Sequence, residues 1–215
     1  MKTQVAIIGG GPAGLLLSQL LSIQGIDSVV LEKHTREHVL SRIRAGVLER
    51  GTTQVLREAG VGENLDEHGI DHEGVHVVFQ GETCRIDFAS ITGSRMTVYG
   101  QTEVTRDLYE ARDRAGATVI HEAQDVKLTD LQTSSPVVHY MHQGQTKTLE
   151  CDFVAGCDGY HGVSRKAMPD DIKNEFERSY PFGWLGVLSD TPPVSHEVIY
   201  AYHERGFALC SMRSE

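Results

Sequence analysis

The hydrophobic pattern near the N-terminus predicts a strand, a tight turn and a helix, followed by a second strand. Gln4–Ile8 is a short apolar run of strand length, and a glycine-rich stretch follows at residues 9–14. Leucines then recur as far as Leu21, and Gly25 is well suited to end the helix that they form. Ser28–Leu31 is the next apolar run. This order is typical of α/β folds with parallel strands.

The pattern then changes along the rest of the chain. Helix periodicity predicts helices over Val47–Ala59 and Gln101–Arg114, and residues 72–100 are expected to form an antiparallel β insertion. The expected later strands are 75–79, Cys84–Phe88, Met96–Tyr99, Thr118–Ile120, Val126–Leu128, Val137–Met141, Thr146–Leu149, Cys151–Ala155, Trp184–Leu188, Val198–Tyr202 and Phe207–Met212. The fold class is therefore α/β: a Rossmann-like domain over residues 1–174, then the start of a mostly β domain over 175–215.

Composition narrows the possible partners and surroundings. The 215 residues are 40% hydrophobic and 23% charged, which is ordinary for a globular protein. A formal net charge of -10 argues against a nucleic-acid or acidic membrane surface. No apolar run reaches membrane-spanning length and no leader pattern precedes the first strand, so a cytoplasmic location is expected. The four cysteines lack C-x-x-C spacing, so no metal site is predicted.

The glycine-rich stretch carries the first chemical signal. Gly9, Gly11 and Gly14 have the spacing of a dinucleotide-binding fingerprint, in which a helix N-terminus faces a pyrophosphate. Glu32 follows about 20 residues later at the end of the next strand, where an acid accepts hydrogen bonds from a ribose diol. A solvated loop charge is the alternative interpretation of Glu32.

Basic residues and one further acid are the other candidates. Lys33, His34 and Arg36 follow Glu32 and could meet a second phosphate, or form a solvated loop face. Arg42 and Arg44 would point to one side of an extended segment and could reach one anion, or be solvated charges. In addition, a strand running into Gly156–Gly159 places Asp158 at a strand end, where open α/β sheets bind ligands.

Taken together, several segments resemble the flavoprotein aromatic hydroxylases. The similarity spans the chain and rests on Val5–Leu17, Arg42–Leu48, Val98–Asp107, Ala155–Arg165, Tyr180–Gly186 and Arg205–Ser211. Glycine at position 162, with His161 and Arg165, resembles the branch of this family that hydroxylates 4-hydroxybenzoate.

The resemblance implies a role for each matching residue. FAD would be held by Gly9, Gly11, Ala13, Gly14, Glu32, Arg42, Ile43, Arg44, Ala45, Gly46, Val47, Gln101 and Asp158. The reductant, NADPH or NADH, would be bound by Lys33, His34, His38, His161 and Arg165. The aromatic acid would be bound by Tyr200, Ser211, Met212 and Arg213. Tyr200 and His72 would form the catalytic proton relay.

Chemistry supports these implied roles, although plainer interpretations stay open. A guanidinium suits a carboxylate, and a phenol that loses its proton becomes electron-rich enough to be hydroxylated. A histidine titrating near neutrality can pass that proton to water. However, Tyr200 could be a sheet aromatic, His72 a surface residue and Arg213 a solvated charge.

The resemblance implies an FAD-dependent monooxygenase that converts 4-hydroxybenzoate to protocatechuate with NAD(P)H and O2. Full-length relatives are expected to be homodimers that continue beyond Glu215, so the chain as given is expected to show weak or no hydroxylation. Two other functions stay open: a non-catalytic protein that only binds FAD or another nucleotide, and an NAD-linked dehydrogenase using the same glycine turn.

Overall fold

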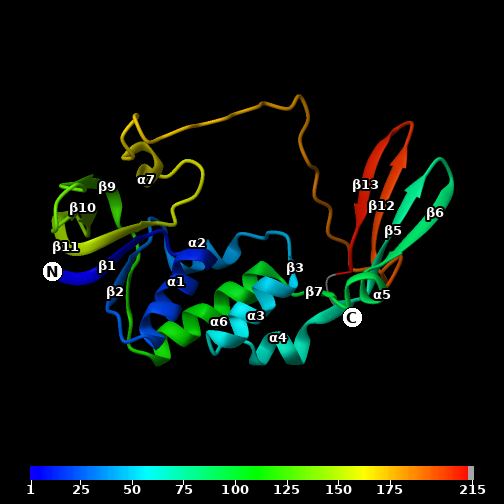
Figure 1. Ribbon diagram of the computed structural model, residues 1–215, viewed down its shortest axis with the longest axis horizontal. Coiled ribbons are helices and arrows are strands. Elements are labelled where there is room, and N and C mark those ends of the chain that lie inside the picture. Colours follow the sequence, from blue (N-terminus) through cyan, green and yellow to red (C-terminus); the bar gives the residue numbers. More distant parts are fainter. Residues whose placement is uncertain (213–215) are drawn as a thin grey trace. The chain divides into compact units, whose positions relative to one another are not determined.

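The computed structural model describes residues 1–212 and divides them into two compact units. Unit 1 comprises Met1–Gly69 and Tyr99–Ala167. Unit 2 comprises Ile70–Val98 and the chain from Met168 onward. Both units are assembled from segments that are distant in sequence (Figure 1).

Unit 1 is built on a six-stranded sheet in the order β8-β2-β1-β11-β10-β9. Its strands are β1 (Lys2–Ile8), β2 (Ser28–Leu31), β8 (Thr118–Ile120), β9 (Gln124–Thr129), β10 (Val137–His142) and β11 (Gln145–Gly156). Strands β8, β2, β1 and β11 are parallel neighbours, whereas β9 and β10 pair antiparallel. The carboxyl ends of β1, β2 and β11 therefore meet at one edge of the sheet.

Helices cover the sheet of unit 1. They are α1 (Pro12–Ile23), α2 (Arg36–Ser41), α3 (Arg50–Glu58), α4 (Glu63–His68), α6 (Gln101–Arg114) and α7 (Val163–Lys166), with a short strand β3 (Val47–Leu48) before α3. Helices α1 and α6 lie side by side (Figure 1). Leu15, Leu56, Leu65 and Leu108, from four of these helices, are buried in one core cluster. Each fully buried leucine contributes about 1.5–3 kcal/mol.

Side chains along β1 point alternately to the two faces of the sheet, so they contribute to two separate parts of the core. Val5 and Ile7 pack toward α1, whereas Ala6 and Ile8 pack against residues of the antiparallel strands such as Val138. This strand is buried on both faces, as is typical of the central strand of an α/β sheet.

The regular secondary structure of unit 2 is mainly β-strand. Strands β4 (Ile70–His72) and β7 (Met96–Val98) pair antiparallel. The four-stranded sheet has the order β13-β12-β5-β6, formed by β5 (Gly74–Phe79), β6 (Glu82–Asp87), β12 (Val198–His203) and β13 (Gly206–Cys210). Helix α5 (Phe88–Thr92) follows β6, and residues 168–197 contain neither helix nor strand.

The predicted mixture of parallel strands, helices and antiparallel strands is confirmed, and the Gln101–Arg114 helix has the expected bounds. Among the described residues, no helix is both long and apolar enough to cross a bilayer. Whether residues 175–215 begin a substrate domain stays a prediction.

Helices α2, α4, α5 and α7 and strand β4 were not predicted, and three predicted elements differ clearly from the structure. Thr146–Leu149 and Cys151–Ala155 were expected as separate strands but form the single strand β11, because its first half pairs with β10 and its second with β1. The prediction of a strand over Trp184–Leu188 was wrong, because this glycine-containing stretch is exposed and pairs with no strand among residues 1–212. The helix expected from Val47 begins at Arg50, after β3.

Candidate cofactor-binding site

The turn between β1 and α1 can be built only with glycine at its first position. Gly9 has φ +108°, and a β-carbon there would lie 2.7 Å from the carbonyl carbon of Cys157 and 2.9 Å from the amide nitrogen of Asp158. Gly9 N–H donates to the Leu31 carbonyl at 2.8 Å, and Cys157 N–H donates to the Ile8 carbonyl at 2.8 Å. The turn is therefore held between the ends of β2 and β11.

The other two glycines of the fingerprint serve the helix. A β-carbon on Gly14 would overlap the Gly9 carbonyl oxygen, so glycine lets α1 lie directly against the turn. A β-carbon on Gly11 would meet no atom within 4 Å. Gly11 caps α1 without any side-chain hydrogen bond, so the first-turn N–H groups stay open. This open cradle fits a diphosphate, which the helix dipole also favours.

Glu32 lies beside the glycine turn and forms another side of the cradle. It lies at the end of β2 and is 7% exposed. Its Oε2 accepts from Gly10 N–H at 2.7 Å, and its Oε1 accepts from His34 N–H at 2.8 Å. A carboxylate has about four acceptor positions, so two bonds leave capacity for ribose hydroxyls.

A cavity of about 870 Å³ brings several predicted residues together at this sheet edge. Its lining includes the predicted residues Gly9, Glu32, Lys33, His34, Asp158 and His161. Residues 123–127, 139–141 and Thr146 also line it and were not predicted. They belong to no motif, and only their place on strands beside β2 and β11 could have pointed to them.

Asp158 is positioned by the short helix that follows it. Its Oδ2 accepts from Ser164 N–H at 2.9 Å and from Ser164 Oγ at 3.1 Å. A β-carbon on Gly162 would overlap the Asp158 carboxylate, so glycine at that position allows the acid to reach Ser164. Burial raises the pKa of the neighbouring Cys157 thiol, which keeps it protonated near neutrality.

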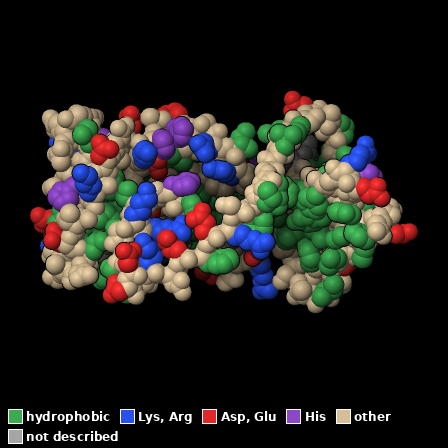
Figure 2. Space-filling view, turned by 90° about the horizontal axis from the view of Figure 1, so that it is seen from above, with side chains coloured by type: hydrophobic (Ala, Val, Ile, Leu, Met, Phe, Trp, Pro, Cys, Tyr) green, Lys and Arg blue, Asp and Glu red, His purple; other side chains and the backbone are tan. Residues whose placement is uncertain are grey.

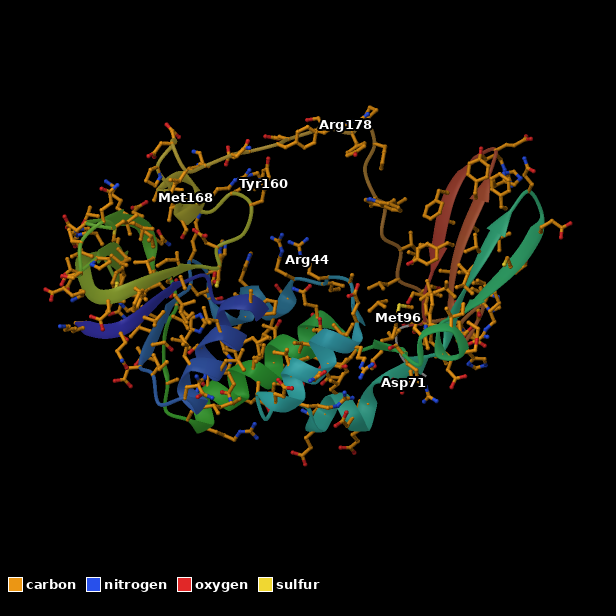
Figure 3. All side chains as sticks on the ribbon, in the orientation of Figure 1. Arg44, Asp71, Met96, Tyr160, Met168 and Arg178 are labelled. Atoms are coloured by element: carbon orange, nitrogen blue, oxygen red, sulfur yellow. The ribbon has the colours of Figure 1, made fainter. Side chains whose placement is uncertain are left out.

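The basic residues form two groups in unit 1, and Figure 2 shows Lys, Arg and His side chains close together on one face of this unit. His34 and His38 stack with ring centroids 4.1 Å apart. In the other group, Arg165 lies over the Tyr160 ring at 4.5 Å, and His161 meets that ring edge-on at 4.9 Å. Tyr160 is labelled on the loop before α7 in Figure 3. The cavity lining includes Lys33, His34 and His161 but not His38 or Arg165.

The remaining predicted FAD residues lie outside the cavity lining. Arg42, Ile43, Arg44 and Ala45 form an exposed loop after α2, and the Arg44 side chain points away from the packed helices (Figure 3). Gly46 is buried and Gln101 at the start of α6 is half-buried, whereas Val47 of β3 and Ala13 in the first turn of α1 are exposed.

Unit 2 contains the candidate catalytic and substrate residues. His72 lies on β4 and is fully buried, and among residues 1–212 neither of its ring nitrogens has a hydrogen-bond partner. Its pKa is lowered mainly by burial, against the opposing effects of Glu197 and Asp71. Tyr200 on β12 is 38% exposed, and within residues 1–212 no hydrogen bond joins it to His72.

The substrate residues at the end of the chain are only partly described. Ser211 Oγ donates to the Met212 carbonyl at 3.1 Å, and Met212 is buried. Arg213 lies outside the described residues. The roles of all these side chains stay predictions.

A parallel β1–α1–β2 unit with an open glycine turn and an acid ending β2 defines a dinucleotide-binding domain. The family model described as "FAD binding domain" matches residues 2–215. The chain therefore belongs to this family, that of the flavoprotein aromatic hydroxylases, and FAD is the dinucleotide for which its glycine turn is built. This membership favours FAD over the alternative of an NAD-linked dehydrogenase.

Among characterised relatives, p-hydroxybenzoate hydroxylase of Acinetobacter baylyi is 53% identical over 216 aligned residues, covering 100% of this chain and 53% of that protein. A 3-(3-hydroxy-phenyl)propionate/3-hydroxycinnamic acid hydroxylase of Paraburkholderia xenovorans is 27% identical, covering 94% of this chain and 32% of that protein. The chain thus spans about half or less of the length of these relatives.

Solved structures agree on the fold. Pseudomonas aeruginosa PqsL in complex with 2-aminobenzoylacetate has a TM-score of 0.74 and 21% identity, covering 93% of this chain and 54% of that one. Pseudomonas putida p-nitrophenol 4-monooxygenase PnpA has a TM-score of 0.67 and 20% identity, covering 76% and 43%. At these identities the likeness shows the fold alone.

Proposed function

We propose that this chain is the FAD-binding part of an aromatic monooxygenase that converts 4-hydroxybenzoate to protocatechuate with NADPH or NADH and O2. The observation that carries the proposal is the 53% identity to p-hydroxybenzoate hydroxylase along the whole chain. The open cradle at Gly11 supports the cofactor part of the proposal. In this proposal residues 1–174 are the FAD-binding domain and residues 175–215 begin the substrate domain.

The glycine turn and Glu32 would hold the adenosine half of FAD. Gly9, Gly11, Ala13 and Gly14 would surround the diphosphate, with the open N–H groups of α1 donating to its oxygens. Glu32 would accept from the ribose hydroxyls with the acceptor positions that Gly10 and His34 leave unused. The rest of the cofactor would be held by Arg42, Ile43, Arg44, Ala45, Gly46, Val47, Gln101 and Asp158.

When bound, FAD would supply the redox chemistry, namely hydride acceptance from NADPH or NADH and oxygen activation for hydroxylation beside the phenol hydroxyl. The basic groups Lys33, His34, His38, His161 and Arg165 would attract the phosphates of the reductant. Three of them, Lys33, His34 and His161, already share the cavity with Glu32.

Substrate binding and proton handling would fall to unit 2. Arg213 and Ser211 would bind the carboxylate of the substrate, next to Met212, and the Tyr200 hydroxyl would take up the phenol proton while releasing its own toward His72. His72 would complete the relay. Its lowered pKa keeps the imidazole neutral near pH 7, which is the form that can accept a proton.

Replacing Gly11 by valine tests the cofactor part. Gly11 has φ −77° and ψ −178°, an extended conformation open to any residue, and its β-carbon position is empty. Gly11→Val is therefore expected to keep the stability of the cofactor-free protein while filling the cradle and raising the Kd for FAD at least about 100-fold. Isothermal titration and thermal unfolding measure the two quantities.

The matched control is Gly51→Val in α3, where a β-carbon also meets nothing within 4 Å. It is expected to leave the Kd for FAD unchanged. If Gly11→Val binds FAD as tightly as wild type, the diphosphate does not lie on this turn.

The reaction is tested by product analysis. The protein is supplied with FAD, NADPH or NADH, O2 and 4-hydroxybenzoate, and protocatechuate is measured by chromatography, with 3-hydroxybenzoate as a competing ring acid. Protocatechuate formation supports the proposed substrate. Since the 215-residue chain alone is expected to show weak or no hydroxylation, tight FAD binding without protocatechuate would favour the nucleotide-binding alternative only if a longer polypeptide, extended to the length of the 53% identical relative, were also inactive.

A further inference from the structure

Tyr109 contacts the glycine turn from helix α6, although it belongs to no motif. Its hydroxyl donates to the Gly10 carbonyl at 3.1 Å, across 99 residues of sequence. The N–H of the same Gly10 donates to Glu32 Oε2 at 2.7 Å. Gly10 lies between Gly9 and Gly11, and both its N–H and its carbonyl are therefore hydrogen-bonded.

The phenol is kept as a donor by its surroundings. Tyr109 is 1% exposed. Burial, followed by the nearby Glu32 carboxylate, raises the pKa of the phenol well above its usual range, so the hydroxyl keeps its proton. A protonated phenol can donate to the Gly10 carbonyl, whereas a phenolate cannot.

Arg36 on α2 holds the ring of Tyr109 from the solvent side. Its guanidinium lies 4.6 Å from the ring centroid, and it pairs with Asp113 of α6 at 2.6 Å. His121 lies beside the same ring, with centroids 5.5 Å apart. A cation over the ring face withdraws electron density from the phenol and makes its hydroxyl a better donor.

We propose that Tyr109 is a positioning residue for FAD: its hydroxyl fixes the Gly10 peptide so that the turn presents its following N–H groups to the diphosphate, and Arg36 assists by holding the ring. The inference rests on FAD occupying the glycine turn. Because α2 follows directly on Lys33 and His34, the contact also links the proposed reductant-binding segment to the FAD cradle.

The expected effect follows from losing one buried hydrogen bond. In Tyr109→Phe the Gly10 carbonyl has no donor and the peptide can rotate, so a smaller fraction of the free protein has the binding-competent turn. We expect the Kd for FAD to rise about tenfold, which corresponds to about 1.4 kcal/mol. ADP carries the same diphosphate, so its Kd should rise by a similar factor.

The matched control is Tyr99→Phe. Tyr99 is also buried in unit 1, its phenol pKa is also raised mainly by burial, and its hydroxyl donates to Asp107 at 2.7 Å instead of to the turn. Both variants should lower the Tm of the cofactor-free protein. Only Tyr109→Phe should raise the Kd for FAD and ADP, and Tyr99→Phe should stay within about twofold of wild type.

Arg36→Gln provides a second measurement that does not depend on a buried substitution. It should raise the Kd for FAD about two- to threefold in wild type and have no further effect in Tyr109→Phe. Arg106→Gln, which removes an exposed cation of α6 paired with Glu103, is its control and should leave the Kd unchanged.

The possible outcomes distinguish the role of Tyr109, the role of Arg36 and the FAD assignment from one another. A Kd for FAD within twofold of wild type in Tyr109→Phe, or an equal rise in Tyr99→Phe, overturns the role of Tyr109. An undiminished Arg36→Gln effect in the Tyr109→Phe background overturns the role of Arg36. Wild-type protein that binds neither FAD nor ADP would instead refute the cofactor assignment on which the inference rests.

Discussion

Gly9→Ala should destabilise unit 1 far more than an ordinary glycine substitution. An alanine at φ +108° adopts a backbone conformation that costs of the order of 1–3 kcal/mol for an L-residue. Its β-carbon would overlap the backbone of Cys157 and Asp158, where no flexible side chain can move aside. The turn would have to shift.

That shift would disturb the hydrogen bonds that hold the turn. Gly9 N–H to the Leu31 carbonyl and Cys157 N–H to the Ile8 carbonyl are both 2.8 Å long, and each contributes about 1 kcal/mol. Together with the backbone strain, the expected loss is about 3–5 kcal/mol. Small domains are stable by only about 5–15 kcal/mol, so a large part of the stability would be lost.

The assay is urea unfolding of the cofactor-free protein followed by far-UV circular dichroism, which reports mainly on unit 1 because α1, α3, α4 and α6 belong to it. Gly25→Ala is the control. Gly25 has φ +70°, and a β-carbon there meets nothing within 4 Å, so only the left-handed backbone cost of about 1–2 kcal/mol applies. Equal destabilisation by the two variants would refute the steric argument.

Two further predictions concern pH and unit 2. Glu197 accepts from Arg85 Nε and Nη2 at 2.7 Å each, and chiefly this interaction lowers the pKa of Glu197. Glu197→Gln should therefore lower the free energy of unfolding by about 1–2 kcal/mol near neutrality. The difference in this free energy between variant and wild type should shrink as pH falls below the ordinary glutamate pKa of about 4.3. A difference that does not depend on pH would contradict the prediction. Burial lowers the pKa of His72, so the unfolded chain binds more protons there, and wild type should lose stability as pH falls through about 6.5 and below. His72→Leu should lack this pH dependence when the stability of unit 2 is measured by native-state amide hydrogen exchange of β4 and β5. An equal pH slope in both proteins would show that His72 does not titrate as its burial requires.

The sequence predicts the elements whose local pattern and tertiary environment agree. The strand Ser28–Leu31 and the helix Gln101–Arg114 have the expected bounds, since the apolar positions of both face a core. The glycine fingerprint could be located because Gly9 and Gly14 answer local steric demands, while Gly11 leaves open the space that a diphosphate needs. By contrast, the extent of β11 depends on having β10 as one partner and β1 as another, and this pairing is not visible in a local window.

Buried polar side chains were the least predictable feature. The periodicity of α6 places Asp107 on its polar face, yet it is 7% exposed and accepts hydrogen bonds from Tyr99 and Asn64. Arg112 is 1% exposed and donates to the Ser18 carbonyl at 2.5 Å. Such burial depends on partners from distant segments, so hydropathy assigns these residues to the surface. Tyr109 was missed for the same reason.

The parallel pairing of β5 with β12 has a consequence for biosynthesis. Val75 pairs with Val198, so β5 waits for roughly 120 further residues before its partner exists. At about 5–20 residues per second this interval lasts of the order of 6–24 s. During that time one edge of the β5–β6 hairpin is unpaired in the nascent chain, and β1 similarly waits for β11. The sheets of both units can therefore be completed only late in synthesis. The emerging polypeptide is expected to depend on chaperones that shield its unpaired strands during translation.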